Sequence, residues 1–183
     1  GVMTAVLRLT TTQVEELCSS FDDVYAVNYN CPGQTVVAGR QEQIDAFSEA
    51  VKAAGGRAMP LKVSGAFHTP YMQEATVALH ECLNKLHVKS PSTLLISNTT
   101  ATPYPDQEEE IIRLMARQAS NSVRFEDTLR YMYSCGVDTF IEIGAGTTLS
   151  GLVRKTLSDV TILNVSDMES LNHTITTLQG KGE

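Results

Sequence analysis

Apolar residues in the first third of the chain recur either at every second position, as in strands, or at every third or fourth position, as in helices. This pattern predicts four strands and two helices. Thr12 and Glu15 have the spacing of a capping box, and Ile44, Phe47 and Val51 repeat at helical intervals. The predicted elements are strands 2–9, 24–28, 35–38 and 58–63, with helices 12–19 and 41–54 between them. The order βαββαβ predicts a ferredoxin-like subdomain over residues 1–63.

Helical stripes alternate with short apolar runs from residue 64 to the end of the chain. The predicted helices are 70–86, 107–119, 125–135, 149–157 and 169–178, and the predicted strands are 93–97, 139–143 and 161–165. Alternation of this kind indicates a parallel sheet. Three strands are few for a sheet covered on both faces, so we expect residues 64–183 to be the C-terminal part of a larger α/β domain.

Composition narrows the class of protein. The chain has 183 residues and a net charge of −7, which argues against nucleic-acid binding. Its apolar runs are shorter than the ~18 residues that span a bilayer, so no membrane segment is expected. The four cysteines form no C-x-x-C motif, which favours reduced thiols in a cytoplasmic protein. His80 and His87 lack a carboxylate or cysteine at ligand spacing, so we predict neither a metal nor a cofactor.

One histidine lies at a position that suits acid–base catalysis. His68 lies in the run SGAFHTPYM, after an apolar strand-like segment and just before Pro70, which suits a first helical turn. At such a corner both ring nitrogens can reach a cleft, as general acid–base catalysis requires. Taken alone, a purely structural role for His68 remains open.

The segments on either side carry a resemblance. AVNYNCPGQTVVAG (26–39), SGAFHTPYM (64–72) and FIEIGAGTTLSGLVRKT (140–156) occur in the order and spacing that resemble the malonyl-CoA:acyl-carrier-protein transacylase family. The resemblance covers nearly the whole chain. It implies an α/β-hydrolase-like large domain over residues 64–183. The implied reaction moves malonyl from CoA to a serine, and then to the phosphopantetheine thiol of acyl carrier protein, in fatty-acid biosynthesis.

The resemblance also implies roles for five residues. His68 would be the general base, and the backbone carbonyl of Gln118 would fix its tautomer. Asn28 and Asn30 would lie near the acyl group, although an asparagine role in a turn remains open for both. Phe67 resembles the phenylalanine that precedes the histidine in malonyl-selective acyltransferases, whereas methylmalonyl-selective relatives carry serine there.

The chain departs from the family pattern in several places. No G-x-S-x-G nucleophile elbow occurs in it, nor do the family's oxyanion-hole glutamine loop and malonyl-binding arginine. We therefore expect the C-terminal part of such an enzyme, inactive alone, which either pairs with an N-terminal fragment or self-associates. Gln118 is followed by Ala-Ser-Asn-Ser, where the family often has an aromatic and Asn-Pro. Gly144–Gly146 matches no phosphate-loop motif and predicts a tight strand-to-helix corner.

Three other interpretations stay open on the residues alone. The chain could be a non-catalytic module that binds carrier protein or CoA, or a piece of an acyltransferase domain from a polyketide synthase. It could also be a different α/β enzyme that pairs His68 with another nucleophile. Ser64 and Thr69, the nearest candidates, are too close to His68 in sequence for the usual dyad.

Overall fold

The computed structural model of the chain describes residues 1–180. They form two compact units, one over residues 1–128 and one from residue 129 onward, which are described separately. The subdomain boundary expected at residue 63 stays a prediction. The segment predicted over residues 64–183 ends in three residues that lie outside the described ones.

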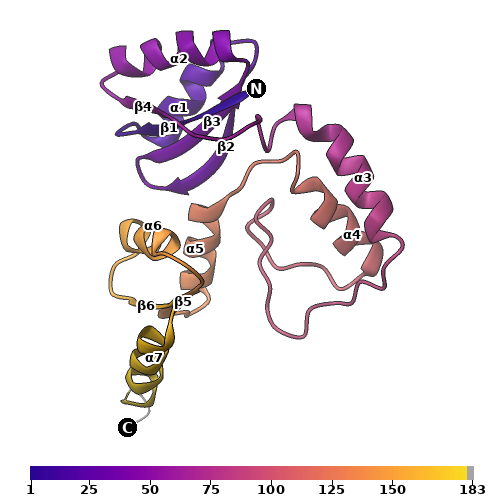
Figure 1. The fold of residues 1–183 in the computed structure, drawn as a ribbon, viewed down its shortest axis with the longest axis vertical. Coiled ribbons are helices and arrows are strands. Elements are labelled where there is room, and N and C mark those ends of the chain that lie inside the picture. The colour runs from indigo at the N-terminus through magenta and orange to yellow at the C-terminus, as the bar shows by residue number, and fades with distance from the viewer. Residues whose placement is uncertain (181–183) are drawn as a thin grey trace. The chain divides into compact units, whose positions relative to one another are not determined.

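An antiparallel sheet forms the start of the first unit (Figure 1). Its strand order is β2-β3-β1-β4, and every neighbouring pair is antiparallel. The strands are β1 (Val2–Leu7), β2 (Val24–Cys31), β3 (Gln34–Gly39) and β4 (Arg57–Pro60), and the helices are α1 (Thr11–Cys18) and α2 (Gln41–Ala53). The predicted ferredoxin-like arrangement is confirmed.

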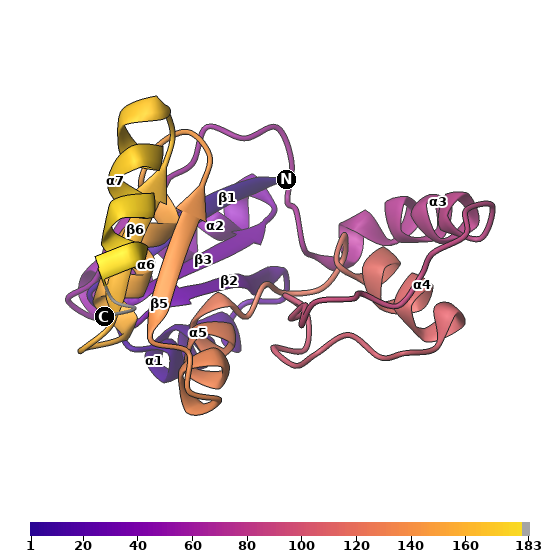
Figure 2. The same ribbon diagram turned by 90° about the horizontal axis from the view of Figure 1, so that it is seen from below.

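Period-2 alternation places one set of strand side chains under α1 and α2. Val6, Val37 and Phe47 are fully buried in the resulting core, and both helices lie on the same side of the sheet (Figure 2). At the end of β3 a Cβ on Gly39 would lie 2.0 Å from the backbone oxygen of Asp23. Only glycine allows that approach, so it fixes the position of the Asp23 backbone beside β3.

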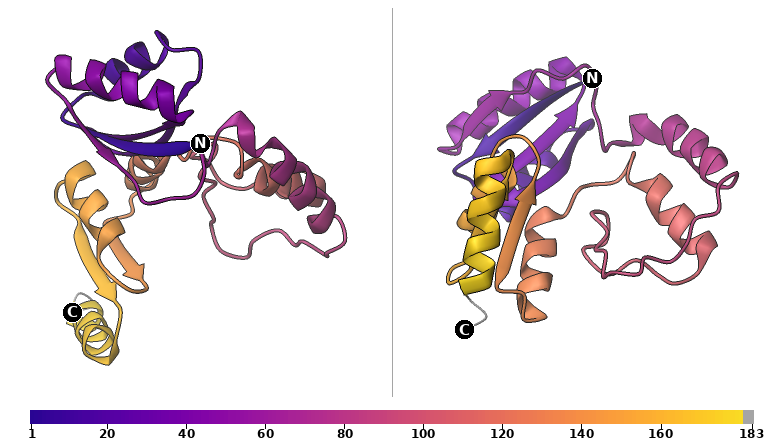
Figure 3. Two further views of the ribbon diagram at one scale, coloured as in Figure 1. Left: turned by 45° about the horizontal axis from the view of Figure 1, so that its top comes forward. Right: turned by 60° about the horizontal axis from the view of Figure 1, so that its bottom comes forward.

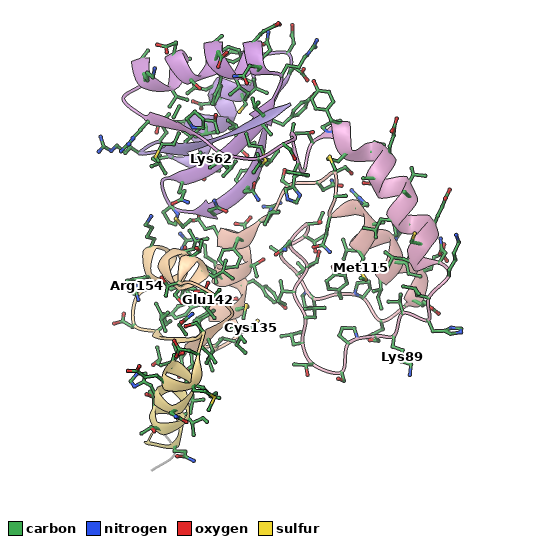
Figure 4. All side chains as sticks on the ribbon, in the orientation of Figure 1. Lys62, Lys89, Met115, Cys135, Glu142 and Arg154 are labelled. Carbon is green, nitrogen blue, oxygen red and sulfur yellow. The ribbon has the colours of Figure 1, made fainter. Side chains whose placement is uncertain are left out.

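A helical pair follows in the same unit. The 3₁₀ turn η1 (Pro70–Met72) leads into α3 (Gln73–Leu83), which packs side by side with α4 (Glu108–Arg117). Leu83, Ile112 and Ala116 are buried between the two helices, and Met115, labelled in Figure 4, packs against them. The predicted single helix over residues 70–86 is therefore a 3₁₀ turn and a shorter α-helix.

A helix start and a strand also differ from the prediction. The capping box of α1 uses Thr10 and Gln13, because the Thr10 hydroxyl accepts from the Gln13 amide and the Gln13 side chain accepts from the Thr10 amide. The predicted strand 93–97 is wrong. Its backbone bonds locally, with the Ser97 amide donating to Thr102 and the Tyr104 amide donating to Leu95, so only an isolated bridge forms there.

The second unit contains a parallel pair of strands, as the α/β pattern predicts. β5 (Thr139–Ile143) pairs in register with β6 (Thr161–Val165), and α6 (Thr148–Thr156) and α7 (Met168–Gly180) pack against them (Figure 3). Helix α5 (Phe125–Ser134) runs into this unit from the first. Among the described residues, no helix is both long and apolar enough to cross a bilayer.

Candidate active site

The backbone of His68 adopts an uncommon conformation. Its φ angle of 63° lies in the left-handed region, which costs a non-glycine residue free energy unless its surroundings enforce it. The next residue, Thr69, is fully buried and helps to hold this conformation. Its hydroxyl donates to the Ala66 carbonyl at 2.6 Å and accepts from the Tyr71 amide at 3.3 Å. Strain of this kind at a non-glycine residue is typical of functional sites.

The end of α4 holds both the ring and the backbone of His68. Its Nδ1 lies 2.8 Å from the Gln118 carbonyl oxygen, and its amide donates to the Ala119 carbonyl at 3.2 Å. The last carbonyls of a helix lack partners within the helix, and His68 uses that of the C-cap Gln118 together with that of Ala119, the residue after it. A carbonyl can only accept, so Nδ1 must carry the proton in the neutral ring. Nε2 is then left as a proton acceptor.

Gln118 is itself held in place. Its side-chain amide donates to the Tyr104 hydroxyl at 2.8 Å. The pKa of Tyr104 is raised because burial disfavours the phenolate, which keeps this hydroxyl neutral. The sequence analysis did not anticipate this contact, since nothing in the spacing of the two residues links a loop tyrosine to the end of α4.

The segment after Gln118 differs in sequence from the family but is well bonded. The Thr76 hydroxyl donates to Ser120 at 2.8 Å, and the Ser122 hydroxyl donates to the Ala26 carbonyl at 2.9 Å. Val123 then exchanges backbone hydrogen bonds of 2.8 Å with β2, where it bridges Asn28. One continuous segment thus connects the imidazole partner to the strand that carries the predicted asparagines.

Asn28 and Asn30 lie half-buried on β2. A register shift after Ala26 makes Asn28 pair with Val36, whose side chain lies on the sheet face opposite the helices. Tyr29 points the other way, and its hydroxyl donates to Glu15 of α1 at 2.8 Å. The roles predicted for the two asparagines stay predictions.

A cavity of about 490 Å³ opens beside His68. Residues of α1, of β2 and of the 120–122 segment line it, including Tyr25, Tyr29, Asn121 and Ser122. Phe67 stands outside this lining, with 38% of its surface exposed. Its ring folds back toward Gly65, where an added Cβ would lie 3.8 Å from the ring.

A buried carboxylate lies under the same turn. Asp23 is 5% exposed and accepts hydrogen bonds from the Tyr71 hydroxyl and from Arg40 Nε. The Tyr71 hydrogen bond, followed by the one from Arg40, holds the pKa of Asp23 below its usual range. The Tyr25 and Tyr71 rings meet edge-on with centroids 6.4 Å apart. The sequence analysis passed over this cluster, because its members are distant along the chain.

In the second unit, a carboxylate closes the corner at Gly144–Gly146. Glu142, labelled in Figure 4, accepts from the Leu149 amide at 3.0 Å and from the Ser150 amide and hydroxyl at 2.7 and 2.6 Å. The pKa of Glu142 is lowered, chiefly by the Ser150 hydroxyl. Glu142 therefore occupies the helix N-terminus at which a phosphate would bind, and the corner is a strand-to-helix turn, as predicted.

Comparison with known proteins assigns the family. The family model described as acyl transferase domain matches residues 1–179. The chain belongs to this family. Malonyl CoA-acyl carrier protein transacylase of Bacillus subtilis (strain 168) is 35% identical to the chain over its whole length, and the enzyme of Staphylococcus aureus (strain COL) is 36% identical over 93% of it. The chain spans 59% and 57% of the lengths of these two relatives.

Solved acyltransferase structures have the same fold. The malonyl CoA-acyl carrier protein transacylase of Clostridium perfringens matches 99% of the chain with a TM-score of 0.94 at 38% identity, and 58% of that structure is covered. A malonyl-transacylase bound to its type II polyketide synthase acyl-carrier protein matches 96% of the chain with a TM-score of 0.92 at 29% identity, again with 58% of that structure covered.

Proposed function

We propose that this acyltransferase chain is the histidine-bearing part of a malonyl-CoA:acyl-carrier-protein transacylase. The observation that carries the proposal is the pair of contacts between His68 and the end of α4, which leaves Nε2 of the neutral ring free to accept a proton. The names of the relatives, and the carrier-protein complex among the solved structures, support malonyl-CoA and acyl carrier protein as its substrates.

His68 would act on a serine that the chain itself lacks, since no G-x-S-x-G elbow occurs in the 183 residues. Nε2 would take the serine proton as the oxygen attacks the malonyl thioester, and would return it to the departing CoA thiol. In the second half-reaction the same nitrogen would take the proton of the phosphopantetheine thiol as its sulfur attacks the malonyl-serine ester, and would return that proton to the departing serine oxygen. The partially negative carbonyls at the end of α4 suit the charge that the ring carries between these steps.

Substitution of His68 tests this proposal in an enzyme that joins these residues to the nucleophile segment. His68→Ala should lower the rate of malonyl transfer on the order of 10²- to 10⁴-fold, because a serine without a base is a weak nucleophile. His87→Ala is the matched control, since His87 is exposed and lies outside the His68 cavity. Transfer at the parental rate by His68→Ala would refute the role of the histidine as base.

A further inference from the structure

The carboxylate of Asp23 is a buried charge that the proposed reaction does not use. It is 5% exposed, and its two named donors come from different parts of the first unit: Arg40 from the start of α2 and Tyr71 from η1. A buried charge is stable only when such donors compensate for its lost hydration. Tyr71 lies three residues after His68, so one of these donors belongs to the histidine turn.

We propose that Asp23 and Tyr71 are positioning residues that hold the left-handed turn at His68 in the geometry needed for proton transfer. The proposal rests on the proposed role of His68 as base. Asp23 suits the task because its backbone is fixed against Gly39 at the end of β3, where no side chain fits between the two. A carboxylate anchored to the sheet can then hold Tyr71 by its hydroxyl.

The contact from Tyr71 to Asp23 ties the C-terminal side of the turn to the sheet. On the N-terminal side, the Thr69 hydroxyl ties the turn to the Ala66 carbonyl at 2.6 Å, and Ala66 packs on the sheet. A left-handed non-glycine residue persists only where the surrounding structure over-determines it. Without the Tyr71 contact, the chain after Thr69 loses its side-chain link to Asp23, and the distance of 2.8 Å between Nδ1 and the Gln118 carbonyl is held less strictly.

Two substitutions separate positioning from mere stability in the enzyme that carries the nucleophile segment. Tyr71→Phe removes only the hydroxyl that reaches Asp23, and we expect kcat to fall on the order of 10-fold with KM little changed, because small misplacements of a catalytic group are costly. Arg40→Met removes a different donor to Asp23, whose side chain is 68% exposed and lies outside the histidine turn, and should leave kcat close to the parental value. Equal kcat values for the two variants would overturn the proposal.

A measurement independent of activity distinguishes this proposal from the proposed function. The ¹⁵N shifts of the His68 ring in the 183-residue chain report which nitrogen carries the proton. Tyr71→Phe should move them toward a mixture of tautomers, whereas Arg40→Met should not. If these shifts behave as expected but His68→Ala does not slow transfer, Asp23 and Tyr71 hold the ring in place but the histidine is not the base. If Tyr71→Phe leaves the shifts unchanged, the positioning role is wrong.

Discussion

Two corners of the molecule lead from a strand into a helix, and both contain residues with positive φ angles. They differ in which residue type adopts those angles. The Gly144–Gly146 corner places its unusual conformations on glycines, with φ angles of 142° and 87°, and closes the following helix with its own Glu142. The corner at residues 64–70 places a φ angle of 63° on His68 and bonds the ring to a distant segment. Glycine adopts such φ angles without strain, so the first corner only connects a strand to a helix. Backbone strain at a residue whose side chain can transfer protons indicates a functional site.

Substitution of Phe67, the residue before the strained histidine, should have the largest effect of the substitutions compared here. Phe67→Ser, in the enzyme with its nucleophile segment, should narrow the preference for malonyl over methylmalonyl by roughly 10- to 100-fold, because we expect the phenyl ring to take the space that an α-methyl group would need. The measurement is kcat/KM for malonyl-CoA and methylmalonyl-CoA side by side. An unchanged ratio would mean that Phe67 has no part in selecting the acyl group.

The second prediction compares backbone strain at the two corners through the free energy of unfolding, measured in urea. Gly146→Ala should destabilise its unit by about 1 kcal/mol, because it places a Cβ in the left-handed region where no neighbour lies within 4 Å to clash. The same order should hold at His68: His68→Gly should be more stable than His68→Ala by about 1 kcal/mol. A His68→Ala variant as stable as His68→Gly would show that the turn is not strained.

Removal of the carboxylate that closes the glycine corner should have the smallest effect. The folded pKa of Glu142 lies below its ordinary value of 4.5, so its contribution to stability is complete above that value and is lost as pH falls through the folded pKa. Glu142→Gln should therefore be less stable than the parent at pH 7, by less than Gly146→Ala. The thermal midpoints of the two proteins should converge in acid, and a constant difference across pH would rule out this linkage.

Local patterns predicted the antiparallel layer well and the site only in part. Alternation in β1, the turn signal before β3 and the helical stripe of α2 predicted the βαββαβ order from local sequence alone. The bond from His68 to the Gln118 carbonyl came from family resemblance, since the two residues are 50 positions apart. Asp23 and Tyr104 escaped prediction because their partners are assembled by tertiary folding, which no local spacing reports.

We propose above all that these residues supply the base and not the nucleophile of a malonyl transacylase. The most direct test measures malonyl transfer from malonyl-CoA to holo acyl carrier protein by the 183-residue chain, alone and with a polypeptide that carries the G-x-S-x-G elbow of a relative. We expect background rates from the chain alone and transfer that depends on His68 when both pieces are present. Malonyl transfer by the chain alone would contradict the account.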